Sequence, residues 1–200
     1  MFPTYTARTS AFRALSAACA LTLAASLAAC AGPPLKLYTL APPSPPASGA
    51  SPETTLQVDH VVLPAYIDNQ DILTRNDNDV KRSDDGRWAE TLSSGITDLL
   101  TADLASRQPK ILVTKQITGG APTARLDVTI SRLDITTGGE GTLVAQWAII
   151  PKNENMLVRR MTATITRTAD TSSDEAVVAM TQALISDLTD RIVTSLPGAF

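Results

Sequence analysis

The sequence contains one histidine and two cysteines in 200 residues, so it is poor in the side chains that most often bind transition metals. This scarcity excludes clusters of Cys and His and most metal sites. Aromatic residues make up only 4% of the chain and the formal net charge is −3, which gives no support to a basic surface for nucleic acid. Hydrophobic residues nevertheless make up 44% and charged residues 18%. The chain can therefore bury a core, and its length suits one domain.

The N-terminal residues have the pattern of a secretory signal peptide. Arg8 and Arg13, with no acidic residue, precede an uncharged, apolar run of sixteen residues at positions 14–29. A basic segment followed by a short apolar segment and small residues is typical of such peptides. As a helix, the run would span roughly 24 Å, less than the ~30 Å hydrocarbon core of a bilayer. We therefore interpret residues 1–29 as a cleaved lipoprotein signal peptide rather than a transmembrane helix.

The apolar run ends in a sequence that resembles a bacterial lipobox. Leu27 and two alanines precede Cys30, which is followed by Ala31. Small residues let the backbone approach a peptidase, and the thiol is the nucleophile that accepts a diacylglyceryl group. We predict lipidation at Cys30; the alternative is an ordinary signal peptide with an incidental cysteine. Cleavage removes 29 of the 200 residues and two arginines, which leaves 171 residues with a net charge of −5. Cys19 leaves with the peptide, so no disulfide is expected.

The residue after Cys30 indicates whether the lipoprotein is expected in the inner or the outer membrane. Ala31 stands where sorted bacterial lipoproteins commonly carry an aspartate if they stay in the inner membrane. By that resemblance, we expect the chain at the periplasmic face of the outer membrane, anchored by its acyl chains, palmitate among them. Residues 30–34 then form an acylated tether.

A Pro-rich segment follows at residues 41–55, with five prolines. Such a composition favours extended chain and cannot bury a core. The segment is either part of a tether between membrane and domain, or a surface loop that leaves a short strand at residues 35–40 docked in the fold. The hydrophobic periodicity does not choose between these two interpretations.

Strands are predicted from apolar alternation and turn residues. Short strands are expected at residues 57–63, 71–75 and 110–113, with a polar, turn-like segment at residues 76–86. Three longer strands, at residues 124–137, 142–150 and 157–168, form a predicted antiparallel meander. In the first of these the apolar positions change from even to odd numbers, so we predict a β-bulge at Ser131 and Arg132.

Two helices are predicted from apolar residues at helical spacing. The first carries Trp88, Leu92, Ile96, Leu99, Leu100 and Leu104, follows Asp84 and Asp85, and is stopped by Pro109. The second starts at a capping box of Ser172 and Glu175 and ends at Pro197. The order of elements predicts a single α+β domain over residues 35–200, with an antiparallel-dominated mixed sheet and two helices packed on one face.

Four segments, in this order after the lipobox, resemble a known family. They are Tyr38-Thr39-Leu40, Val61-Val62-Leu63-Pro64-Ala65-Tyr66-Ile67-Asp68, Ile72-Leu73-Thr74-Arg75 and Arg87-Trp88-Ala89-Glu90-Thr91-Leu92. The chain resembles the auxiliary lipoproteins of ABC-type transport systems, the PqiC-like family, across nearly all of its mature length. The match departs from the family at Leu37, where an aromatic residue is frequent, and in the length of the Pro-rich segment.

The resemblance implies a non-enzymatic docking or scaffold subunit. It would act beside a mammalian-cell-entry (MCE) protein, a component of systems that carry phospholipid or other hydrophobic molecules across the periplasm. Some family members are thought to form rings, so self-assembly into a homo-oligomer is part of the expectation. A lipid- or glycolipid-binding outer-membrane assembly lipoprotein is the alternative, and an apolar cavity between helices and sheet would favour it.

The remaining chemistry-bearing residues form no recognisable catalytic or cofactor motif. His60 is the one imidazole and no motif supplies it with partners; Ser93 lies in a helical pattern without the strand-turn-helix context of a nucleophile elbow. The acidic residues from Asp77 to Asp85 lack the spacing of an EF-hand. We expect no metal, cofactor or nucleic acid, and no hydrolase. Trp88 and Trp147 are expected in the core, with a partner contact as the alternative for Trp147, and the Arg159-Arg160 pair at a wet strand edge.

Overall fold

The computed structural model describes residues 34–40, 54–116 and 120–196, and residues Lys36–Phe200 form one compact unit. The predicted signal peptide, the lipidation site Cys30, the tether up to residue 33 and residues 41–53 of the Pro-rich segment lie outside the described residues. Among the described helices, none is long and apolar enough to cross a membrane.

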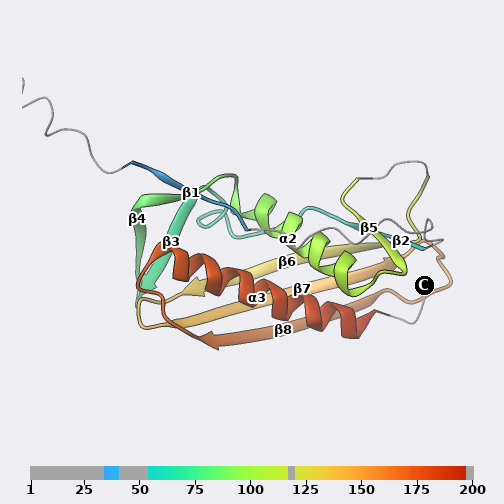
Figure 1. Cartoon of the computed structure of the whole chain (residues 1–200). Coiled ribbons are helices and arrows are strands. Elements are labelled where there is room, and N and C mark those ends of the chain that lie inside the picture. Colours follow the sequence, from blue (N-terminus) through green and yellow to red (C-terminus); the bar gives the residue numbers. More distant parts are fainter. Residues whose placement is uncertain (1–33, 41–53, 117–119, 197–200) are drawn as a thin grey trace, which may run out of the picture. The chain divides into compact units, whose positions relative to one another are not determined.

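Within the described residues, the larger of two sheets contains five strands, whose arrangement Figure 1 shows. They are β2 (Thr54–Val58), β5 (Ile111–Thr114), β6 (Ala124–Ile135), β7 (Glu140–Pro151) and β8 (Arg159–Thr168). Their order in the sheet is β5-β2-β6-β7-β8. Strands β6, β7 and β8 form the predicted antiparallel meander, and β2 runs parallel to both of its neighbours.

The smaller sheet was not predicted as a separate unit. It contains β1 (Lys36–Tyr38), β4 (Asp79–Trp88) and β3 (Asp71–Asn76), in that order. β3 and β4 form an antiparallel hairpin whose turn includes Asp77 at a φ of 52°. The Thr137 amide donates to the Arg75 carbonyl at 3.0 Å, so this sheet adjoins the turn between β6 and β7.

The predicted polar turn at residues 76–86 is wrong, because most of that segment is strand β4. The residues of β4 are largely exposed. A strand with both faces in solvent shows no alternation of apolar and polar residues, so its sequence does not indicate a strand. The boundaries of β2 also differ from the predicted 57–63: it begins at Thr54, inside the expected Pro-rich loop, and ends at Val58. Val62 then forms only an isolated bridge with Thr129.

Two helices, α2 (Leu92–Arg107) and α3 (Asp174–Ser195), pack against the large sheet and against each other, as Figure 1 shows. The apolar stripe of each predicted helix is buried from Leu92 to Leu104 and from Val177 to Ile192. The α+β fold with an antiparallel-dominated mixed sheet and packed helices is thereby confirmed. The β-bulge is also confirmed, since the β6–β7 register shifts between Ile130 and Arg132.

Both helices begin later than predicted. Trp88 is the last residue of β4, and its amide donates to the Gln70 carbonyl at 2.7 Å. Asp84 and Asp85 therefore lie in a strand and not before a helix. At α3 the N-cap is Ser173, whose hydroxyl accepts a hydrogen bond from the Ala176 amide at 3.2 Å. The predicted capping box of Ser172 and Glu175 is wrong by one residue.

Candidate functional site

The chain enters the described domain as strand β1, which lies beside the end of β4. Lys36 and Tyr38 pair with Gly86 and Trp88 in a parallel register. The Tyr38 carbonyl accepts a hydrogen bond of 2.8 Å from the Ala89 amide. Of the two interpretations of this segment, the short docked strand is the one that the structure confirms.

Side chains fasten β1 to the first turn of α3. The Tyr38 hydroxyl donates a hydrogen bond of 2.6 Å to Glu175 Oε1, and Lys36 Nζ lies 3.4 Å from the same oxygen. Chiefly because of the Tyr38 hydrogen bond, the pKa of Glu175 is lowered to about 2. The same bond raises the pKa of Tyr38 to about 12. The phenol therefore stays a donor and the carboxylate an acceptor at neutral pH. We call Lys36, Tyr38 and Glu175 the clasp.

A second connection joins β4 to the same turn of α3. Ser83 Oγ donates to Asp174 Oδ2 at 2.7 Å and accepts from the Gly86 amide at 2.9 Å. Gly86 lies directly against the Asp174 carboxylate, and a Cβ at this position would collide with it. The absence of a side chain at Gly86 thus permits β4 to lie close to the first turn of α3. Asp174 and Glu175 both lie in the first turn, where the helix dipole favours negative charge.

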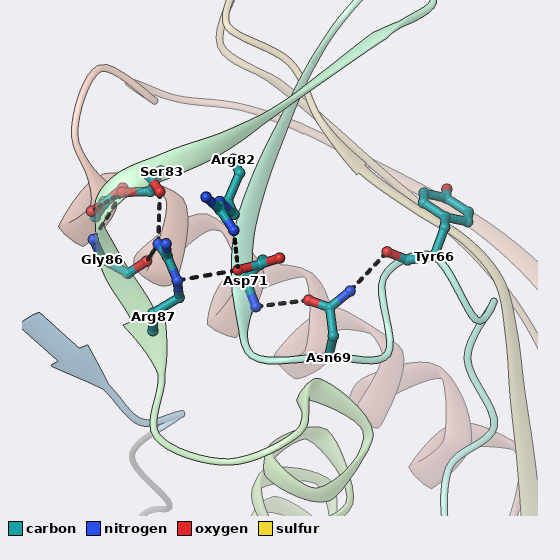
Figure 2. Close-up of polar contacts among 8 residues, drawn as sticks. Tyr66, Asn69, Asp71, Arg82, Ser83, Gly86 and Arg87 are labelled. Carbon is teal, nitrogen blue, oxygen red and sulfur yellow. Dashed lines mark hydrogen bonds and ion pairs between the residues drawn. The ribbon is translucent and has the colours of Figure 1, made fainter. Parts of the chain in front are cut away.

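Figure 2 shows the polar contacts that hold the β3–β4 hairpin and the segment before it. Asp71 Oδ1 lies 3.1 Å from Arg87 Nε, and Arg87 donates to two backbone carbonyls of β4. On the other side, the Asn69 side chain accepts from the Asp71 amide at 2.7 Å and donates to the Tyr66 carbonyl at 2.9 Å. These contacts fix the start of β3 relative to the end of β4.

The segment before β3 also caps α2. The N-cap residue Thr91 makes no side-chain capping bond. Instead, Asp68 Oδ1 accepts from the Ser93 amide at 3.1 Å and the Asn69 carbonyl accepts from the Leu92 amide at 3.1 Å. Unpaired amides of a helix's first turn need such acceptors. Asp68 therefore performs the role of a remote N-cap.

A buried carboxylate joins the small sheet to the large one. Arg75 Nε on β3 lies 2.9 Å from Asp134 Oδ1 on β6, at ion-pair distance although its N–H is not directed along a hydrogen bond. Arg132 Nε donates to the other oxygen at 2.7 Å, and the Arg75 guanidinium lies 5.9 Å from the centre of the Tyr66 ring. Burial would raise the pKa of Asp134, but the hydrogen bond from Arg132 and the positive charge of Arg75 outweigh it and lower that pKa.

His60 and Ser93 lie at the distance of a general base and a nucleophile. His60 Nε2 is 3.0 Å from Ser93 Oγ. Ser93, however, is only 1% exposed, in the first turn of α2, and a nucleophile must be reachable by its substrate. This geometry fits a hydrogen bond that satisfies a buried hydroxyl. In the described part of the chain, no group of three or more His, Cys, Asp or Glu residues could hold a metal ion.

Both tryptophans are buried, as predicted. Trp147 Nε1 donates to Ser195 Oγ at 3.0 Å, so its polar end is satisfied inside the core. Trp88 lines a cavity between the small sheet and α3 that also touches Leu73 and Val177 and has a volume of about 30 Å³. Pockets for small molecules are typically ~300 Å³ or larger. This cavity is therefore too small for a lipid chain.

The four segments that carried the family resemblance meet at one end of the domain. Tyr38 binds α3, Asp68 caps α2, Arg75 binds Asp134 and Trp88 fills the core. Sequence reasoning identified the segments but not these contacts. The partner of Tyr38, for example, is 137 positions away, and no local pattern links the two.

Comparison with known proteins agrees with this architecture. One similar crystal structure, of an uncharacterized protein, has a TM-score of 0.70 and 16% identity, and the match covers 82% of this chain and 100% of that one. A Xanthomonas campestris protein of the DUF330 family has a TM-score of 0.61 and 17% identity, with 79% and 92% covered. No curated protein matches the sequence. Residues 38–193 match the family described as ABC-type transport auxiliary lipoprotein component, and the chain belongs to that family.

Proposed function

We propose that the chain is an outer-membrane lipoprotein, acylated at Cys30, that serves as a docking or scaffold subunit for the MCE-domain protein of an ABC-type lipid transport system. Membership of the transport auxiliary family supports the general role. The role is positional rather than catalytic, and the domain acts by holding a partner at the periplasmic face of the outer membrane.

The observation that carries this proposal is the attachment of β1. Five residues separate Cys30 from Lys36, so their Cα atoms lie at most about 21 Å apart in extended chain. The strand that follows is held by backbone pairing with β4 and by the clasp. Acyl chains at Cys30 would thus hold the clasp end of the domain close to the membrane. Confinement to a surface raises the effective concentration of a binding module for its partner.

The lipid-binding alternative receives no support from the described core. Its cavity beside α3 measures about 30 Å³, roughly a tenth of a typical small-molecule pocket. Helices α2 and α3 pack directly on the sheet with fully buried side chains such as Ile96, Leu184 and Leu188. A docking role needs only the outside of such a domain.

The test is isolation of the full-length protein from its native membranes in mild detergent. Mass spectrometry of the N-terminal peptide reports acylation of Cys30, and the copurifying proteins and lipids are identified in the same preparation. Native mass spectrometry of the complex counts the copies of this chain, which tests homo-oligomer formation. A Cys30→Ala variant is the control for membrane attachment.

An acylated Cys30 with an MCE protein attached is the expected result. An acylated chain that brings down phospholipid but no protein would favour the lipid-binding alternative. An unmodified chain that stays in the soluble fraction would reject the lipidation site and the outer-membrane location with it.

A further inference from the structure

The turn between β7 and β8 has an apolar tip next to a hydrogen-bonded turn. The Asn153 side chain accepts a hydrogen bond from the Asn155 amide at 3.0 Å, and the Asn153 backbone carbonyl accepts one from the Met156 amide at 2.9 Å. The Lys152 amide donates to the Thr123 carbonyl at 2.9 Å, which ties the turn to the start of β6. The backbone that leads to the tip is therefore held by hydrogen bonds.

Four apolar side chains next to this turn face solvent. Leu157 is 88% exposed, and Met156, Val158 and Met161 are between 37% and 45% exposed. Single exposed apolar residues are ordinary, but a contiguous group is typical of an interaction site. Met161, Ala163 and Ile165 lie on one face of β8. Ile165 is buried, whereas Met161 is exposed. The strand therefore turns from core to surface as it nears the tip.

Positive charge surrounds this apolar group. Lys152, Arg159 and Arg160 are exposed, and Glu154 is the one acidic residue between positions 151 and 161. None of the three cations forms an ion pair with another described residue, whereas Arg75, Arg125 and others do. Cations without internal partners are available to carboxylates of another molecule, and such complementarity steers association.

The tip lies at the opposite end of the domain from the clasp. α3 begins beside the β6–β7 turn, where the Thr171 hydroxyl donates to the Thr136 carbonyl at 2.8 Å, and the clasp binds that first turn of α3. β7 runs from this turn to the tip over twelve residues, a length of roughly 36 Å at the usual rise of a strand. Figure 1 shows β1 and the β7–β8 turn at opposite ends of the Lys36–Phe200 unit.

We infer that the tip formed by Lys152, Met156, Leu157, Val158, Arg159, Arg160 and Met161 docks a protein component of the transport system, one that presents an apolar patch bordered by carboxylates. The inference rests on the proposed function for the orientation of the domain. With the clasp end held at the membrane, the tip faces away from the bilayer, toward a protein that approaches from the far side. A bilayer is the less suitable occupant because the short tether restrains the other end.

Site-specific photocrosslinking in cells that produce the full-length chain tests this inference. A benzophenone amino acid replaces Leu157 in one strain and Val80 in the control strain. Val80 is a partly exposed apolar residue of β4, at the clasp end. We expect a crosslink from position 157 to a transport-system protein, identified by mass spectrometry, and none to that protein from position 80.

The charge requirement is tested in the same background. Arg160→Glu should lower the yield of the position-157 crosslink about tenfold, because it would set a carboxylate against the carboxylates of the partner. Lys81→Glu, an equivalent charge reversal on β4, should leave it unchanged. Circular dichroism of each purified variant checks that it folds.

Each other outcome overturns the inference. Products with phospholipid alone would assign the tip to the bilayer, and products with a second copy alone would assign it to self-assembly. A product within the chain would mean that one of its own segments covers the tip, and folded variants without any product would mean that nothing docks there. A crosslinked transport protein other than the MCE protein would support the inference while contradicting the proposed MCE docking.

Discussion

Asp134 binds two arginines that differ in burial, and this difference predicts unequal effects of removing them. The Arg75 side chain is 24% exposed and the Arg132 side chain 54% exposed, while Asp134 is 8% exposed. Arg75→Met and Arg132→Met each delete one guanidinium and keep most of the aliphatic stem. The two variants therefore compare a largely buried ion pair with a largely solvated one, at the same carboxylate.

Arg75→Met should lower the free energy of unfolding by about 2 kcal/mol. Breaking a fully buried pair costs ~3–5 kcal/mol, but here Arg132 still binds Asp134 and part of Arg75 meets water. Loss of the contact with the exposed Tyr66 ring adds up to about 1 kcal/mol. Arg132→Met should cost less than about 1 kcal/mol, as is usual for exposed pairs.

Urea unfolding of the full chain, followed by fluorescence of the two buried tryptophans, measures both values. Trp88 lies in the small sheet and Trp147 in the large one, so the signal reports both. Asp134→Asn, alone and with Arg75→Met, completes a double-mutant cycle for the pair. Equal destabilisation by the two arginine variants, or a coupling energy near zero, would refute the conclusion that Arg75 and Asp134 hold the two sheets together.

Three further predictions follow from single contacts. Gly139→Ala should lower the free energy of unfolding by more than about 1 kcal/mol, since Gly139 has a φ of 89° and a Cβ would lie 2.6 Å from a backbone carbonyl. The neighbouring control, Gly138→Ala, should change the free energy of unfolding by less than about 0.5 kcal/mol. Equal chemical-denaturation midpoints for the two variants would contradict this prediction. The lowered pKa of Glu175 contributes stability that is complete above pH 4.5 and lost as the pH falls toward about 2. The difference in melting temperature between wild type and Tyr38→Phe should therefore shrink as the pH falls over that interval. A difference that stays constant with pH would show that the clasp does not titrate. Cys30→Ala should move the protein from the membrane to the soluble fraction on cell fractionation, and retention in the membrane would reject acylation as the anchor.

The large sheet and the helices were predictable because their patterns are local and strong. β6 alternates apolar and polar residues over twelve positions, and the change of parity after Ile130 can be reconciled with one buried face only by an extra residue. The observed register shift between Ile130 and Arg132 is that extra residue. The apolar stripe of α3 likewise predicted which residues are buried, although its N-cap is one position later.

The small sheet could not be predicted as a unit: β3 matches the short strand expected at residues 71–75, but β4 and the pairing of the three strands are specified by tertiary contacts. β4 contains six charged residues among ten and resembles a loop by composition. It is a strand because Asp77 permits a tight turn, β3 pairs on one side and β1 on the other. Trp88 fits the helical spacing of the following residues equally well. Its amide hydrogen bond to the Gln70 carbonyl and its pairing with Tyr38 of β1 show that it is extended.

The contacts of the motif residues indicate where function resides in this domain. Tyr38, Asp68 and Trp88 bind or pack against other parts of the domain at the clasp end, so their substitution acts first on stability and attachment. Leu157 and Arg160 have no such internal role, because both are exposed at the other end. A variant at either position should therefore change the recovery of a protein partner while leaving the unfolding midpoint unchanged. The proposed docking role requires this separation, since the clasp end would keep its contacts while the tip binds and releases a partner.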